Sequence, residues 1–357
     1  MYSILLIIIL SLVAGYYTFY RKQKHYGVIQ NIKPVPATFT WESQTPLPIR
    51  PFVNKRDFNP SMGVKNIGKT PEDWLLIEDT YLSNIKLRKK SLQLQPEIMS
   101  YVYNNEISKQ SLGEFYNFMV EFLIQRYPMY FKTNIFSNLV TNIITNDEPF
   151  PKSSKSLTSD EIMNIIARNI EEDFLILIKD NPEDKSEEYI LRSSLNSFPA
   201  GFDPSVNFNQ PVSFIHKPVP QYKSRLQFTM GKFFNNMKEK DMWVRHNWSI
   251  QTHGNLFNVG SNHGREGDEL IPLKYEEIDF ENGCFLRCER QVFIRLPKTK
   301  LIVMTIRTYL TPIDKIKQEG NAKELIRGID SLPEDLAFYK KRGVWGQAVK
   351  EYLNNED

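Results

Sequence analysis

The stretch from Glu281 to Pro312 constrains the fold more than any other part of the chain. It contains two runs rich in Val, Ile, Leu, Phe and Thr, which are separated by the five residues Leu296 to Lys300. Such side chains favour extended backbone, and two runs joined by a short connection are typical of antiparallel neighbours. The stretch therefore predicts a long β-hairpin around which the rest of the chain packs.

Polar side chains recur at every second position in the first run of this hairpin. Arg287, Glu289 and Gln291 share one face of the predicted strand, because successive side chains point to opposite sides. Such a row is either a solvated outer face of the sheet or the lining of a pocket. The residue types alone leave both interpretations open.

Composition limits the class of protein. The 357 residues are 41% apolar and 13% aromatic, enough to bury a large core in one or two domains. The formal net charge is only +3, so the chain lacks the basic excess of a nucleic-acid-binding protein. Its two cysteines, Cys284 and Cys288, are four apart in one predicted strand, which favours reduced thiols in a cytosol-facing domain. Two cysteines are also too few for an iron–sulfur cluster, and no G-x-G-x-x-G motif follows a strand.

The first 20 residues carry no charged side chain, and Arg21, Lys22 and Lys24 follow them directly. About 20 uncharged residues suffice to cross a bilayer, and basic residues mark the cytoplasmic end of such a segment. We expect residues 1–20 to be a transmembrane anchor, with the main domain in the cytoplasm. A buried core helix is the alternative.

Two segments after this anchor need separate interpretations. Residues 21–57 are rich in Pro, Thr, Asn and Lys without a clear period, which predicts a linker or an extended arm. Residues 63–70 read G-V-K-N-I-G-K-T and match the pattern of a phosphate-binding loop, but no apolar strand precedes them. We interpret Thr70 as the N-cap of a helix instead, because Pro71 and two acidic residues follow it.

The remaining chain predicts further helices and strands. The predicted helices run from Thr70 to about Lys89, from Ser111, from Thr158, and from Lys223 to Lys240; the predicted strands are Asp173 to Lys179, Tyr189 to Leu195 and Met242 to Gln251. Ser111 and Thr158 have Glu three residues later, as in a capping box, and so does Ser331 ahead of a short helix in the tail. Runs of helices and of antiparallel strands, with a sheet of at least five strands, indicate an α+β fold.

Several short motifs occur in a characteristic order. They are Met62-Gly63, Asp73-Trp74, Phe198-Pro199, I-H-K-P-V-P from Ile215, R-H-N-W-S from Arg245, and L-R-C-E-R-Q, R-L-P and T-I-R-T-Y-L in the hairpin. Together they resemble the signature of the haem-dependent oxidative N-demethylase-like family, here in a membrane-anchored, fungal-type form. The resemblance implies a PAS-like antiparallel sheet, wrapped by helices around a haem, in residues 58–315. Residues 316–357 are then a C-terminal helical tail.

The histidines supply the candidate iron ligands. His216 lies next to a stiff P-V-P segment, and a histidine there is either an axial ligand or a core residue that bonds a backbone carbonyl. The resemblance makes His216 the expected iron ligand, because a neutral imidazole is the usual proximal group of an oxygen-binding haem. His246 stands where the family motif has a small residue, and His253 and His263 lie in a Gly- and Asn-rich loop where we expect exposure.

The resemblance also implies the other site residues. Arg245 and Glu289 are expected beyond the haem, where an arginine holds bound oxygen and a carboxylate binds a cationic amine or relays protons. A structural Arg–Glu ion pair is the alternative. Arg307 and Tyr309 are expected to face the same way and, with Arg287, to line the pocket or reach a propionate. Cys288 stands where the family has an aliphatic residue, so we reject a thiolate ligand.

The expected function is a haem-dependent N-demethylase-like monooxygenase that releases formaldehyde from a small secondary amine. Because this chain has no nicotinamide or iron–sulfur site, electrons must come from a separate flavin or iron–sulfur reductase that uses NAD(P)H, with tetrahydrofolate as a possible formaldehyde acceptor. The alternatives are a haem- or ligand-sensing PAS-like module and a scaffold without haem. We expect a single-pass protein of the endoplasmic reticulum whose main domain faces the cytoplasm.

Overall fold

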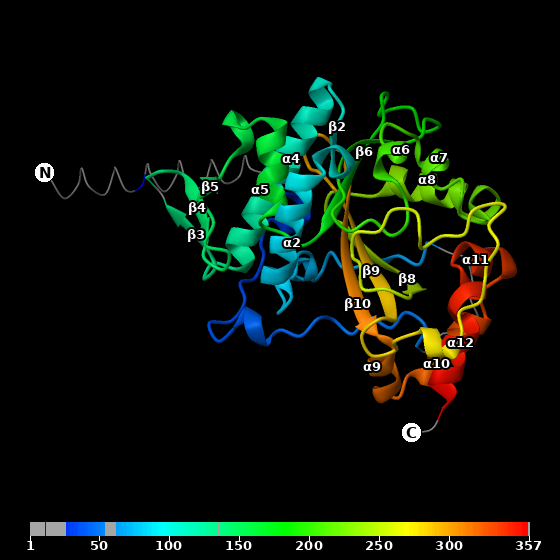
Figure 1. Cartoon of the computed structure of the whole chain (residues 1–357). Helices are drawn as coiled ribbons and strands as arrows, with labels where there is room; N and C mark the ends of the chain where they lie inside the picture. The colour runs from blue at the N-terminus through cyan, green and yellow to red at the C-terminus, as the bar shows by residue number, and fades with distance from the viewer. Residues whose placement is uncertain (1–10, 12–25, 54–61, 135, 356–357) are drawn as a thin grey trace, which may run out of the picture.

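The computed structural model describes residue 11 and residues 26–53, 62–134 and 136–355. Within these ranges an antiparallel sheet of seven strands runs through the middle of the molecule (Figure 1). In their order across the sheet the strands are β1 (Lys65–Asn66), β8 (Met242–Gln251), β9 (Phe285–Arg295), β10 (Ile302–Pro312), β6 (Asp173–Ile178), β7 (Ile190–Leu195) and β2 (Ser100–Val102). The α+β class and the three strands predicted before the hairpin are confirmed.

The predicted hairpin is the centre of this sheet. β9 and β10 pair in unbroken register from Arg295 opposite Ile302 to Phe285 opposite Pro312. Their turn is closed by the backbone bond from Leu296 N to Leu301 O at 2.9 Å, and the carboxylate of Glu114 accepts the next two turn amides. A long-range carboxylate therefore fixes the turn from outside.

Helices cover both faces of the sheet (Figure 1). On one face lie α2 (Tyr81–Leu94), α4 (Glu106–Arg126) and α5 (Ser159–Ala167), and on the other α6 (Pro204–Asn207), α7 (Val212–Ile215) and α8 (Gln227–Asn236). The tail adds α9 (Ile313–Gln318), α10 (Ala322–Asp330), α11 (Glu334–Tyr339) and α12 (Arg342–Asn354). The smaller elements include α3 (Pro96–Met99), a π-helix at Tyr222–Leu226, and a second sheet of β3 (Phe131–Asn134), β4 (Leu139–Asn142) and β5 (Phe150–Pro151).

The apolar core follows the alternation of the strands. Val292 and Val303 point towards α4 and α5, whereas Phe293 and Ile302 point towards α7 and α8. A third cluster joins the lower ends of β8, β9 and β10 to α9, α10 and α12. The tail is therefore packed onto the sheet.

Helix ends differ from the predictions in three places. Thr158 caps α5 with a complete capping box, as predicted. Ser111 lies inside α4, which begins five residues earlier because the side chain of Asn105 caps it. Thr70 makes no side-chain cap; a 3-10 turn follows it, and α2 starts only at Tyr81. Ser331 ends α10 instead of starting α11.

Residues 26–53 form an arm laid along the domain. Ile29 is fully buried in the core beside α4, and Phe52 is buried in the third cluster against the Trp248 ring. The predicted anchor at residues 1–20 lies, except for residue 11, outside the described residues. No helix among the described residues is long and apolar enough to span a membrane.

Candidate functional site

The predicted polar row lies on the sheet face that carries α7 and α8. β8 pairs with β9 so that Arg245 is opposite Gln291 and Asn247 is opposite Glu289, which places all four side chains on one face. Glu289 is only 9% exposed and Gln291 only 8%. The row is therefore buried, and the interpretation as a solvated outer face is wrong.

Two amide side chains connect a central carboxylate to two cations. Gln291 donates from Nε2 to Glu289 Oε2 at 3.0 Å and accepts from Arg245 Nη1 at 3.1 Å. Asn247 donates from Nδ2 to the same oxygen at 3.5 Å and accepts from Lys340 Nζ at 3.4 Å. The order Arg245–Gln291–Glu289–Asn247–Lys340 is called the five-residue chain below. Each amide presents its oxygen to a cation and its nitrogen to the carboxylate.

Arg245 is the cation at one end of this chain. Burial lowers the pKa of its guanidinium, while the charge of Glu289 raises it. Its Nε is buried without a hydrogen-bond partner among the described residues. The alternative of a direct structural ion pair between Arg245 and Glu289 is not observed: the two are linked through Gln291, and among the described residues the Nε donor of Arg245 stays unused.

Lys340 is the cation at the other end, and it comes from the C-terminal tail. It follows α11, is 7% exposed, and also donates to the backbone oxygen of Trp248. In the described part of the chain β1 pairs with Trp243 and Val244, and Lys340 contacts β8 beyond these two residues. Burial lowers the pKa of the Lys340 amine to about 8.

Loops close the lower end of the row around Arg287. Arg287 is 1% exposed and donates to the backbone oxygens of Phe198 at 2.6 Å and Leu256 at 3.2 Å. Its Nε, like that of Arg245, has no partner among the described residues. Arg287 thus ties together two loops that lie 58 residues apart in the sequence.

The two loop histidines are partly buried, contrary to the expected exposure. His263 stacks on Tyr339 at 4.4 Å between ring centroids, and burial together with Lys340 and Arg287 lowers its pKa to about 3. His253 bonds the side chains of Asn258 and Asn262. Both rings therefore join this loop to its surroundings.

His216 ends α7 on the same side of the sheet as the polar row. Its Nδ1 lies 2.9 Å from the carbonyl oxygen of Val212, and its ring stacks on Tyr222 at 4.8 Å. Burial lowers the pKa of the imidazole, and the charge of Arg245 lowers it further, so the ring is neutral at pH 7. A neutral ring that donates from Nδ1 to a carbonyl has its lone pair at Nε2, the arrangement usual in metal-binding histidines.

Arg307 and Tyr309 lie on the opposite face of the sheet, so the expectation that they face the polar row is wrong. In β10 they stand opposite Arg290 and Cys288, not Glu289. Arg307 Nη1 lies 2.6 Å from Glu171 Oε2, and its Nη2 lies 2.7 Å from Glu78 Oε2.

Three carboxylates surround the single cation of Arg307. The third belongs to Glu172, whose Oε1 lies 3.6 Å from Arg307 Nη1. Burial raises the pKa of Glu171 to about 7, and neither carboxylate oxygen of Glu172 has a hydrogen-bond partner among the described residues. Tyr309 bonds Glu78 at 3.3 Å. Arg307 and Tyr309 thus belong to a buried ion cluster beneath α2.

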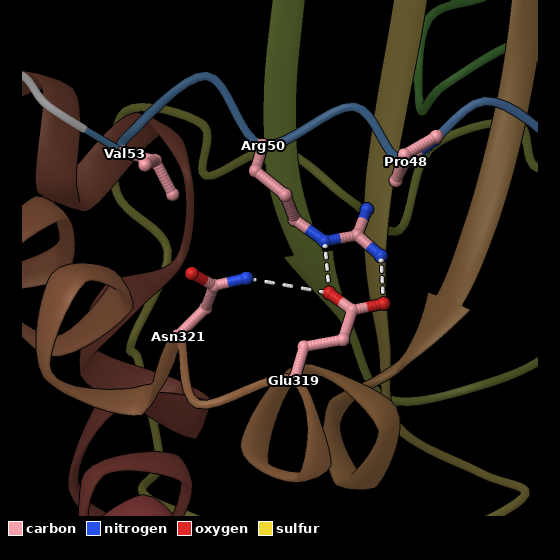
Figure 2. Close-up of a pocket in the computed structure, with 5 residues that line it drawn as sticks. All are labelled: Pro48, Arg50, Val53, Glu319 and Asn321. Carbon is pink, nitrogen blue, oxygen red and sulfur yellow. Dashed lines mark hydrogen bonds and ion pairs between the residues drawn. The ribbon is translucent and has the colours of Figure 1, made fainter.

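A surface hollow lies apart from the polar row, between the arm and the start of α10 (Figure 2). There Arg50 of the arm binds Glu319 through two parallel hydrogen bonds of 2.8 and 2.9 Å, and Asn321 donates to the same carboxylate. The charges are mutually satisfied, so the hollow marks the attachment of the arm.

Sequence reasoning missed two members of the five-residue chain. Asn247 lies two positions after Arg245 in the R-H-N-W-S motif, and this period of two is the signal that could have found it. Lys340 has no comparable signal, because it reaches the row from another element 93 residues beyond Asn247. Among the described residues no group of three or more His, Cys, Asp or Glu is placed to hold a metal ion.

A family model described as haem-dependent oxidative N-demethylase, alpha subunit-like, matches residues 63–350. The match includes the hairpin, His216 and the polar row. It also extends through α11 and most of α12, so it includes Lys340 and most of the segment predicted to be a separate tail.

Proposed function

We propose, since the chain belongs to the haem-dependent oxidative N-demethylase, alpha subunit-like family, that it oxidises a small secondary amine with dioxygen and releases formaldehyde. Family membership supports a haem-dependent oxidoreductase. The observation that supports the finer proposal is the five-residue chain, which buries one carboxylate between two cations on the face that carries His216. We propose also that the antiparallel sheet is PAS-like.

The residues on this face fit a haem in both ligand chemistry and charge. His216 has a neutral ring fixed at Nδ1, so its Nε2 would hold the iron. Among the described residues of the row, the buried cations Arg287 and Lys340 and the partly buried Arg245 accompany the carboxylate of Glu289. Buried cations without matching anions are costly, and the two propionates of a haem would balance the excess. Within the part of the chain that the structure describes, the buried Nε donors of Arg245 and Arg287 have no partner, so each is available to such an anion.

When bound, haem supplies the oxygen-activating redox chemistry. The work of this chain is then to bind and orient the amine and to hold protons. Glu289 receives both hydrogen bonds of the chain at Oε2, which leaves Oε1 to pair with a secondary ammonium ion. The cation of Arg245, placed by Gln291, would hold an anionic oxygen by charge-assisted hydrogen bonds.

Electron supply and the fate of the product require partners. We propose a separate flavin or iron–sulfur reductase that uses NAD(P)H as the electron source, with tetrahydrofolate as a possible acceptor of the formaldehyde. The absence of a dinucleotide motif and the burial of both cysteines support the need for a separate reductase. We propose further that residues 1–20 anchor the protein in the endoplasmic reticulum membrane with the domain facing the cytoplasm, which the uncharged run and the basic residues after it support.

An absorption spectrum of the purified full chain, followed by amine-dependent formaldehyde release with a supplied reductant, tests the proposal. We expect a Soret band and release of one formaldehyde per amine demethylated. A haem spectrum without turnover of any secondary amine would favour the sensing module, and failure to bind haem would leave a scaffold.

A further inference from the structure

We propose that Lys340 is a charge gate for the amine at Glu289: its protonated form weakens the binding of a secondary ammonium ion, and its neutral form permits it. This inference deepens the proposed function and rests on it. Lys340 would act as a positioning and specificity residue, because it reaches Glu289 through Asn247.

Hydrogen bonds to backbone oxygens hold Lys340 in position beside the polar row. Lys340 Nζ donates to the backbone oxygen of Trp248 in β8 and lies 5.8 Å from the centroid of the Trp248 ring. Its own backbone oxygen accepts the Trp345 indole N–H at 3.0 Å, which fixes the start of α12 behind it. Lys340 is therefore anchored both at its backbone oxygen and at its amine.

The end of α11 is also fastened to the loop over the row. Gly264 N donates to Tyr339 O at 2.9 Å, and a Cβ on Gly264 would lie 2.5 Å from the backbone oxygen of Phe338. This close approach requires glycine. The position of Lys340 therefore depends on backbone contacts as well as on its own hydrogen bonds.

The charges around Lys340 decide the sign of the effect. An ammonium ion at Glu289 would lie close to the positive charges of Lys340 and Arg245, and positive charges close together in a poorly solvated site repel strongly. Loss of the Lys340 proton removes one of them without changing the shape of the site. The titratable and charged groups that interact electrostatically with Lys340 are Glu289, Arg245, Cys288 and His263.

The pKa of Lys340 itself lies close to neutral pH. Its pKa of about 8 results from burial, with the charge of Glu289 opposing the shift. The pKa of Cys288 is raised to about 12 and that of His263 is lowered to about 3, so neither changes charge between pH 7 and 9. A secondary alkylamine stays protonated over this range, since its pKa is on the order of 10, like that of lysine.

The experiment measures the dissociation constant of dimethylammonium by its perturbation of the haem spectrum, from pH 6.5 to 9.5. Wild type should bind about tenfold more tightly at pH 9 than at pH 7. Lys340→Met should bind tightly with a flat pH profile, and Lys340→Arg should bind weakly throughout. Lys350→Met is the matched control, because Lys350 pairs with Asp330 on the surface of the tail, and it should behave as wild type.

A second readout needs neither haem nor amine. Because the folded state binds fewer protons at Lys340 than the unfolded state between pH 8 and about 10.5, stability should rise with pH in that window. Lys340→Met should lose this rise, whereas Lys350→Met should keep it.

The possible results distinguish failure of the Lys340 charge gate from failure of the demethylase proposal. A pH profile for amine binding that is unchanged in Lys340→Met overturns the gate and leaves the demethylase proposal intact. Absence of amine binding in wild type and all variants overturns both, and the stability readout then shows whether Lys340 titrates as the structure indicates.

Discussion

Gln291 stands between Arg245 and Glu289, accepting a hydrogen bond at 3.1 Å from one and donating a hydrogen bond at 3.0 Å to the other. The two charged groups are thus coupled without touching, and each keeps capacity for a ligand. In a direct ion pair the two charged groups would bind each other, and neither would be available to a ligand.

Removing either charge should therefore impair chemistry more than folding. We expect Arg245→Ala and Glu289→Gln to retain haem and to lose turnover by roughly 10²-fold, as for a charge-stabilising or acid–base group. Formaldehyde release per folded molecule and the melting temperature are measured on the same preparations. Loss of several kcal/mol of stability, on the order of 3 to 5, with intact specific activity would identify a structural pair instead.

His216→Ala should lose the haem or show a changed Soret band. The reason is that removal of the imidazole leaves the iron to water or to another histidine. His246→Ala is the control, because His246 is exposed, is opposite Arg290 in the register and so lies on the other face of the sheet. Equal spectra for wild type and His216→Ala would move the search for the ligand to His253 and His263.

Arg307→Leu should destabilise the protein by about 3 to 5 kcal/mol, because it leaves buried carboxylates without their shared cation. Denaturant unfolding measures the loss. Lys350→Ala removes a solvent-exposed pair with Asp330 and should cost less than about 1 kcal/mol. Comparable losses in the two variants would contradict a compact ion cluster under α2.

Glu171 should make the protein less stable as the pH rises from 4.5 to about 7. Its raised pKa means that the folded state binds the proton more tightly than the unfolded state, so the advantage is lost as the pH rises through about 7. Glu171→Gln should flatten this part of the stability profile and stabilise the protein at pH 7.5 by up to about 3 kcal/mol. Its amide oxygen can still accept the 2.7 Å bond from Asn84. An unchanged slope in the variant would show that another carboxylate binds the proton.

The strands were predictable because each has a local signal in the sequence. The sequence does not show which side chains of two neighbouring strands lie on the same face of the sheet. Alternation within β9 placed Arg287, Glu289 and Gln291 together, but which side of β10 faces them depends on the turn. Closure by Leu296 and Leu301 sets Ile302 opposite Arg295, so the side chain of Arg307 lies with Arg290. One residue more or less would have reversed every side chain of the return strand.

The helix starts also show that a local sequence pattern does not by itself fix where an element begins. The capping box at Thr158 is a real helix start, because Thr158 itself has extended backbone and α5 begins directly after it. At Ser111 the same pattern lies within a helix that Asn105 has already started, and the Ser111 hydroxyl bonds the Ser108 carbonyl instead. Lys340 could not be found at all, since its role arises from contacts between elements far apart in the sequence.

The arm of residues 26–53 is synthesised long before the residues that it binds in the folded protein. It leaves the ribosome early, but the carbonyl of Ile49 accepts from Cys288, 239 residues later, and Arg50 binds Glu319, 269 residues later. At roughly 5 to 20 residues per second, the arm remains without these partners for about 10 to 50 seconds. Its apolar side chains, Ile49 and Phe52, are exposed to chaperones and to other nascent chains during that interval, and the last turns of the protein to be made are those that cover them.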